Sequence, residues 1–97
     1  MIVVTSGHVA GKKIKQTLGI SSGNTVRSRN IGKDITAAFR NIVGGEVMEY
    51  AQLLSSSRSQ AIERMIDHAE NMGANAVVDV RITTSAVMAG TSEILAY

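Results

Sequence analysis

A long stripe of apolar residues in the second half of this 97-residue chain limits the folds that are open to it. From Val47 to Met72 the apolar residues recur at spacings of three and four, which predicts one long helix with a single buried face. Gly73 follows the stripe directly and is a natural cap for the helix C-terminus. Arg58 interrupts the stripe at a position where an apolar side chain is expected. A helix of this kind needs a sheet or other helices to cover its apolar face.

A second apolar stripe, over residues 31–43, comes before the long one and predicts a shorter helix. Gly44–Gly45 separates the two stripes. Two glycines in a helix interior cost roughly 2 kcal/mol relative to two alanines, so the first helix is expected to end there. A phosphate-binding loop would open from a strand into a helix, and the carboxylates of Glu46 and Glu49 would repel an anion at this point. The glycine pair therefore favours a corner between two helices over a ligand loop.

Strand patterns flank the predicted helices on both sides. Ile2 to Thr5 is a β-branched run, and residues 13–28 alternate apolar with polar positions around glycines and serines, which favours bent strands over a helix. Residues 74–85 alternate cleanly and predict a continuous strand, and a last strand is expected from about Ser92, after a turn at Ala89–Gly90. The order β-β-α-α-β-β predicts an α+β fold, with the helices, one of them long, on one face of an antiparallel sheet.

The composition argues against several classes of protein. Cysteine is absent, so neither disulfides nor thiolate chemistry is expected. The net charge is +2, and the basic cluster Lys12, Lys13 and Lys15 has no interleaved aromatic residues, so nucleic-acid binding is not favoured. The N-terminus shows no secretory leader and no apolar run reaches the ~20 residues of a membrane span, so we expect a soluble cytoplasmic protein with no membrane partner. Residues 1–97 fit one domain, small enough to benefit from self-association.

Three stretches of the chain resemble a known family. The sequences "SGNTVRSRNIGKDITAAFRNIVGGEVMEYAQLL", "ERMIDHAENMGANAVVDVRITTS" and "GTSEILAY" are similar to the YbjQ family, small bacterial and archaeal proteins described as heavy-metal-binding, with no established reaction. The resemblance covers nearly the whole chain. It implies an α+β subunit with a dodecin-like arrangement, assembled as a homopentamer whose short strands help to join neighbours. Soft metals prefer thiolates or clustered imidazoles, whereas the histidines here are only His8 and His68, so no metal ligands are predicted and no cofactor is identified.

Polar residues around the two predicted helices form the candidate ligand site. Asn30 suits a helix N-cap and Asp34 suits the first turn, which is a structural role. The alternative is a pocket between subunits in which Arg40 or Arg29 meets a carboxylate or phosphate ligand. Arg58 either lays its stem over apolar surface or pairs with an acidic residue of another chain. The candidate ligand-binding residues are Asn30, Asp34, Arg40, Glu46, Tyr50 and Arg58.

The residues favour a non-enzymatic, self-assembling protein that holds a small ligand or metal ion between its subunits, and the resemblance implies that the assembly is a pentamer. A closed assembly would satisfy the strand edges that one small subunit leaves open. The alternative is an enzyme of unknown reaction with acid and base groups at a subunit junction. Its first candidates are Asp34, Arg40, Glu46 and Tyr50.

Overall fold

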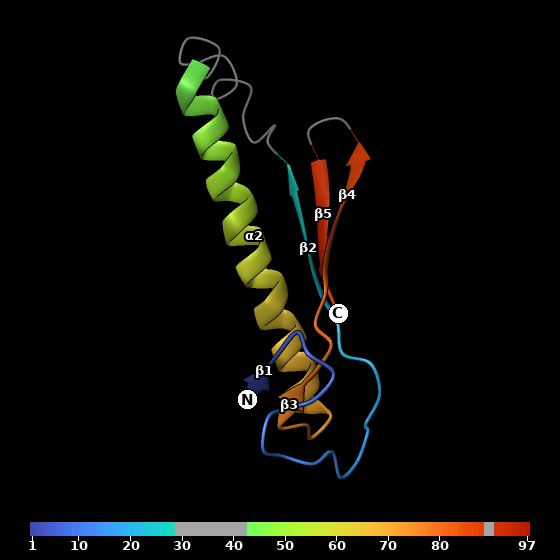
Figure 1. Ribbon diagram of the computed structural model, residues 1–97. Coiled ribbons are helices and arrows are strands. Elements are labelled where there is room, and N and C mark those ends of the chain that lie inside the picture. The colour runs from blue at the N-terminus through green and yellow to red at the C-terminus, as the bar shows by residue number, and fades with distance from the viewer. Residues whose placement is uncertain (29–42, 89–90) are drawn as a thin grey trace.

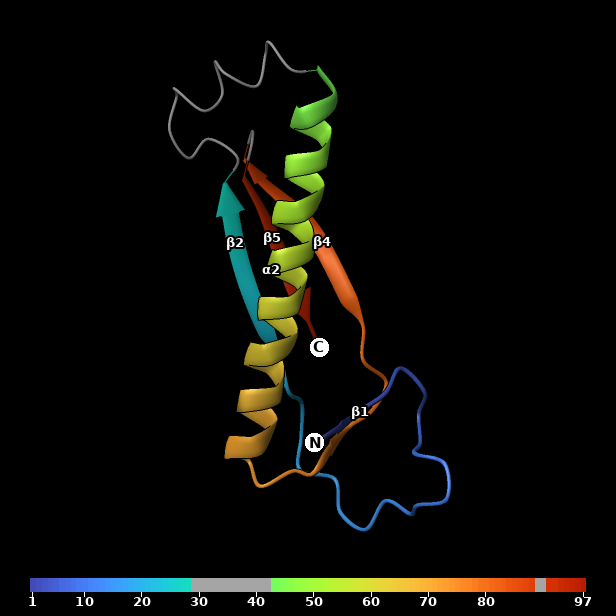
Figure 2. The same ribbon diagram turned by 90° about the vertical axis from the view of Figure 1, so that its left-hand side faces the viewer.

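The computed structural model of the chain describes residues 1–28, 43–88 and 91–97. The described part contains one long helix and five strands, namely α2 (Val43–Asn71), β1 (Ile2–Val3), β2 (Gly23–Ser28), β3 (Ala76–Val77), β4 (Ile82–Met88) and β5 (Thr91–Ala96). The helix lies along one face of the sheet formed by β2, β5 and β4 (Figures 1 and 2). The predicted α+β fold, with one long helix on a small antiparallel sheet, is therefore confirmed.

The three-stranded sheet has the order β2-β5-β4, and both of its pairings are antiparallel. Ala96 of β5 lies between Gly23 of β2 and Ile82 of β4, which fixes the register on both sides. A separate pair, β1 with β3, is parallel and lies beside the C-terminal end of α2 (Figure 1). β5, the last strand of the chain, is thus the central strand of the sheet.

The C-terminus of α2 is where the sequence predicted it. Gly73 takes a φ of 86° and donates its N–H to the carbonyl of Glu70 at 2.9 Å, while the N–H of Ala74 reaches the carbonyl of Ala69 at 3.0 Å. These two bonds form a Schellman cap, which requires the left-handed residue that glycine adopts at little cost. The chain is then turned back toward β3.

The start of α2 differs from the prediction. The helix begins at Val43, so Gly44–Gly45 lies inside its first turn and does not precede it. Glycine is well tolerated at helix N-termini, where the first backbone N–H groups have no partner within the helix. The predicted helix over residues 31–43 and the predicted turn at Ala89–Gly90 fall outside the described residues.

The core lies between α2 and the strands. On the helix it consists of Ala61, Met65 and Ala69, which follow one another at spacings of four, as the predicted stripe requires. The other members of the core are Val77, Val80, Ile94 and Ala96. Ser57, one turn before Ala61, continues this buried row and is fully buried, whereas Arg58 is exposed. The interruption of the apolar stripe is therefore Ser57, a small residue that lets the sheet approach the helix closely.

Three of the predicted strands are shorter than expected, and the first of them spans only Ile2–Val3 of the predicted Ile2 to Thr5. Residues 12–22 have no regular structure, so only Gly23–Ser28 of the predicted 13–28 stretch is a strand. Residues 74–85 do not form one strand, because Asp79 has a φ of 54° and separates β3 from β4. A left-handed residue breaks the alternation of side chains, and Val77 and Val80 are both buried as a result. The prediction of two continuous faces over this stretch was wrong.

Candidate functional site

The structure describes only part of the predicted ligand site. Asn30, Asp34 and Arg40 lie outside the described residues. Glu46 and Tyr50 belong to the N-terminal turns of α2, and Arg58 is exposed on the same helix. A site made from these six residues stays a prediction.

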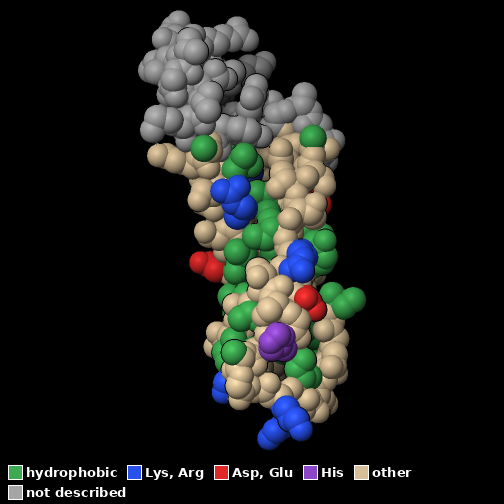
Figure 3. Space-filling view, in the orientation of Figure 1, with side chains coloured by type: hydrophobic (Ala, Val, Ile, Leu, Met, Phe, Trp, Pro, Cys, Tyr) green, Lys and Arg blue, Asp and Glu red, His purple; other side chains and the backbone are tan. Residues whose placement is uncertain are grey.

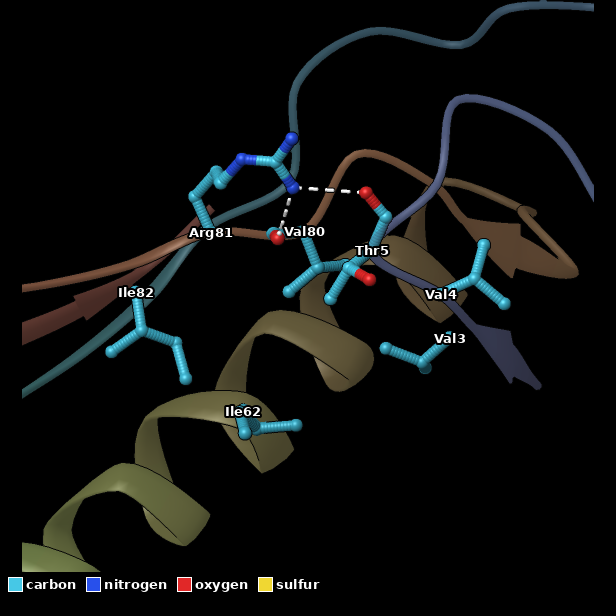
Figure 4. Close-up of a pocket in the computed structure, with 7 residues that line it drawn as sticks. All are labelled: Val3, Val4, Thr5, Ile62, Val80, Arg81 and Ile82. Carbon is cyan, nitrogen blue, oxygen red and sulfur yellow. Dashed lines mark hydrogen bonds between the residues drawn. The ribbon is translucent and has the colours of Figure 1, made fainter.

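A hollow that sequence reasoning missed lies at the other end of the helix. It has a volume of about 380 Å³ and is lined by Val3, Val4, Thr5, Ile62, Val80, Arg81 and Ile82. Figure 4 shows Ile62 of α2 below the hollow, with Ile82 on one side and Val3 on the other. Three segments that are far apart in the sequence therefore form one apolar surface.

Backbone hydrogen bonds hold the N-terminal segment in place to form this hollow. The N–H of Val4 donates to the carbonyl of Val77 at 3.0 Å, and the N–H of Val80 donates to the carbonyl of Val4 at 3.2 Å. Further along, the N–H of Asp79 donates to the carbonyl of Ser6 at 2.8 Å. The left-handed backbone of Asp79 turns the chain here, so that residues on both sides of it contact the N-terminal segment.

Arg81 fixes the rim of the hollow. Its Nη1 donates to the carbonyl of Thr5 at 2.9 Å and to that of Val80 at 2.8 Å (Figure 4). The guanidinium thus joins the N-terminal segment to the start of β4. The seven lining residues include no carboxylate and no imidazole, so the hollow offers no acid–base pair and can accept an apolar group.

A row of polar contacts joins β2 and its approach to α2. Ser21 Oγ donates to the carbonyl of Met65 at 2.6 Å, and Thr25 Oγ1 donates to the carbonyl of Ser57 at 3.1 Å. The Ser57 hydroxyl in turn donates to the carbonyl of Leu53 at 2.7 Å. Buried hydroxyls are costly unless they are bonded, and these three are. Ser57 is therefore a structural residue.

The exposed side of the same contact carries charged and imidazole groups. Arg64 Nη1 donates to the carbonyl of Asn24 at 2.6 Å, and His68 Nδ1 accepts the N–H of Ser22 at 3.2 Å. Arg27 bonds through Nη2 to the side-chain oxygen of Gln60. One nitrogen of His68 is therefore engaged with the backbone and is not free to bind a ligand.

The donor set does not fit a soft-metal centre within one chain. The sequence has no cysteine, and no group of three or more histidine, aspartate or glutamate residues comes together among the described residues. Soft heavy metals prefer thiolates or several imidazoles. In the part of the chain that the structure describes, the His68 ring is held by Ser22, and His8 offers its carbonyl to the Ser6 hydroxyl.

Charged side chains of both signs are mixed on one face of the molecule (Figure 3). Figure 3 shows basic and acidic side chains scattered over that face of the molecule, without a patch of one sign. None of the described helices is long and apolar enough to cross a membrane.

The comparisons with known proteins agree with each other over the full chain. Residues 1–97 match the model of the YbjQ family, whose description is "Putative heavy-metal-binding". The chain is 52% identical to a UPF0145 protein of Methanosarcina acetivorans over its whole length, and it covers 92% of that protein. It is also 50% identical to a UPF0145 protein of Thermosipho melanesiensis, covering 90% of it, and 46% identical to one of Clostridium perfringens, covering 92%.

Proposed function

Since this chain belongs to the YbjQ family, we propose that it is a non-catalytic subunit that assembles with identical copies into a closed ring, a pentamer, and holds a small ligand at the junctions. The observation that supports this proposal most is the imbalance between buried and exposed apolar side chains. Among the described residues, the buried core has seven members, three of which are alanines, whereas nine large hydrophobic side chains are exposed. A stable single chain would bury more of them.

The shape of the chain supports the same proposal. Its Cα radius of gyration is 17.0 Å, whereas a compact domain of this length has a radius of about 12–13 Å. An elongated chain exposes more surface for its volume and gains less stability from its own core. Association with further copies would cover part of that surface and add apolar burial.

Light scattering coupled to size-exclusion chromatography tests the assembly. We expect a mass of five times the 10.3 kDa of one chain, unchanged over at least a tenfold dilution. A defined mass that corresponds to another number of subunits would contradict the pentamer but not the assembly itself. A compact monomer at all concentrations would overturn the proposal as a whole.

Metal binding has a separate test. Equilibrium dialysis of the assembled protein against Zn²⁺, Cu²⁺ or Ni²⁺, followed by elemental analysis, is expected to give far less than one ion per chain. The reason is the donor set, with no thiolate and with one nitrogen of His68 already bonded to Ser22. The His68→Ala variant serves as the control and should take up the same small amount. One ion per chain or per ring would show that groups of neighbouring subunits form a metal site, and the ligand would then be the metal.

A further inference from the structure

The outer edge of β4 is a row of backbone groups that the described residues leave unpaired. Arg81 and Tyr97 exchange two backbone bonds, of 2.7 and 2.9 Å, and form a hydrogen-bonded pair directly before β4. Since such pairs alternate along an antiparallel ladder, Ile82, Thr84 and Ala86 direct their N–H and C=O groups away from β5. No hydrogen bond to another described residue reaches these groups.

At the other edge of the sheet, that of β2, side chains of α2 bond some of the outward backbone groups. By the same alternation, Ser22 and Asn24 direct their backbone groups outward from β2. The N–H of Ser22 is taken by His68, and the carbonyl of Asn24 by Arg64, both from α2. The helix therefore covers the start of the β2 edge, whereas β4 projects beyond it (Figure 2).

The sequence of β4 contains few of the features that keep an edge strand from pairing with another strand. The sequence ITTSAVM has no charged residue and no proline, the usual means by which an edge strand is kept from pairing. A bulge falls between Ala86 and Met88, at the far end of the strand, and leaves the first five residues regular. Those five residues, 82–86, are all exposed. The edge can thus accept a strand.

Whereas β4 is a strand with an open edge, residues 13–20 are a segment without a strand partner. They belong to no strand, all their side chains are exposed, and no backbone hydrogen bond joins them to other described residues. Ile14, Leu18 and Ile20 are 59%, 41% and 82% exposed, and they alternate with polar positions as in a strand with one apolar face. This segment leads into β2, at the sheet edge opposite to β4.

We propose that the outer edge of β4 binds residues 13–20 of a second copy of this chain as an added strand. This inference rests on the proposed self-assembly and specifies the two segments through which neighbouring copies bind. Each chain then carries an acceptor edge on one side of its sheet and a donor segment next to the other side. Such a head-to-tail contact is heterologous, and it closes into a ring when the rotation between copies allows it.

The two faces of the added strand match the two faces of the sheet. With Ile14 and Leu18 on the helix side, they extend the apolar layer at Ile82 and cover the hollow between Ile82 and Val3. Lys13 and Lys15 then lie on the far side of the sheet, with Thr83 and Ser85 of β4. Burial of the apolar side chains thus selects this orientation of the strand.

Adjacent lysine substitutions test this orientation. Leu18→Lys would place a charge in the apolar layer and is expected to weaken assembly at least tenfold, as measured by light scattering over a dilution series. Thr17→Lys, one residue away, adds the same charge to the face that already carries lysines and should change assembly by less than twofold. Both side chains are exposed in the single chain, so the helix signal in circular dichroism should not change. Equal effects of the two variants, or none, would overturn the added strand.

Cross-linking identifies the partner edge, and the absence of natural cysteine makes it simple. When Leu18→Cys and Thr84→Cys proteins are mixed, dissociated and reassembled, a short bismaleimide should give cross-linked pairs that contain one chain of each kind. Each variant alone should stay uncross-linked. Self-linking of Thr84→Cys would show that β4 pairs with β4, and no cross-link in an assembled protein would show a contact elsewhere. Either result contradicts the contact between β4 and residues 13–20 and leaves the proposed assembly standing, whereas a monomeric parent protein contradicts both proposals.

Discussion

Replacing Gly23 with alanine is expected to destabilise the folded chain by about 3 kcal/mol or more. A Cβ at this position would overlap the backbone nitrogen of Met65 and the backbone oxygen of Ala61, and it would lie 2.7 Å from the backbone carbon of Arg64. Overpacking against a flexible side chain can be relieved by a rotamer change. Here all three neighbours are backbone atoms of α2, so the strand and the helix would have to separate.

Urea unfolding followed by circular dichroism measures this loss, at one protein concentration because association adds to the apparent stability. Gly7→Ala is the matched control. Its Cβ would meet only the carboxylate of Asp79, at 3.5 Å or more, which is ordinary contact. We expect the control to change the free energy of unfolding by less than about 0.5 kcal/mol. Equal stability of the two variants would mean that β2 does not lie against α2 as described.

Local patterns in the sequence predicted the parts of the fold that depend on neighbouring residues. The stripe from Val47 to Met72 and the glycine after it determine the helix and its end, since side-chain period and cap both act within a few turns. The predicted start of the helix was wrong, because the prediction assigned to Gly44–Gly45 the free-energy cost of glycines in a helix interior. The pair lies in the first turn of α2.

Features that depend on tertiary contact left little trace in the sequence. Gly23 opens a strand and its sequence context does not show that a helix backbone lies against it. Ser57 is buried where α2 packs against β2, and Thr25, 32 residues away, bonds to its carbonyl; a periodicity count shows neither feature. The hollow combines residues near positions 4, 62 and 81, so no motif could have indicated it. The sequence also did not indicate that residues 13–20 are exposed and irregular, because their alternation of apolar and polar residues is that of an ordinary strand.

Met65→Ala is expected to cost about 2–5 kcal/mol, the range for removing a large side chain from a packed core. Met65 is fully buried and is among the largest such side chains of the described residues, at the centre of the row Ala61, Met65 and Ala69. Its neighbours in that row are alanines, which cannot move in to fill the space. The bond from Ser21 reaches the Met65 backbone carbonyl and does not need the side chain, so the loss should come from packing alone.

The control for this substitution is Met65→Leu, which keeps most of the volume and is expected to cost less than about 1.5 kcal/mol. Both variants are compared by urea unfolding at one protein concentration, with light scattering to show whether assembly is kept. Because Met65 faces the sheet of its own chain, Met65→Ala should lower the stability of the subunit and leave the number of subunits unchanged. If Met65→Ala instead dissociated the protein while the subunit stayed folded, the buried face of α2 would belong to a contact between chains. The core described for the single chain would then be wrong.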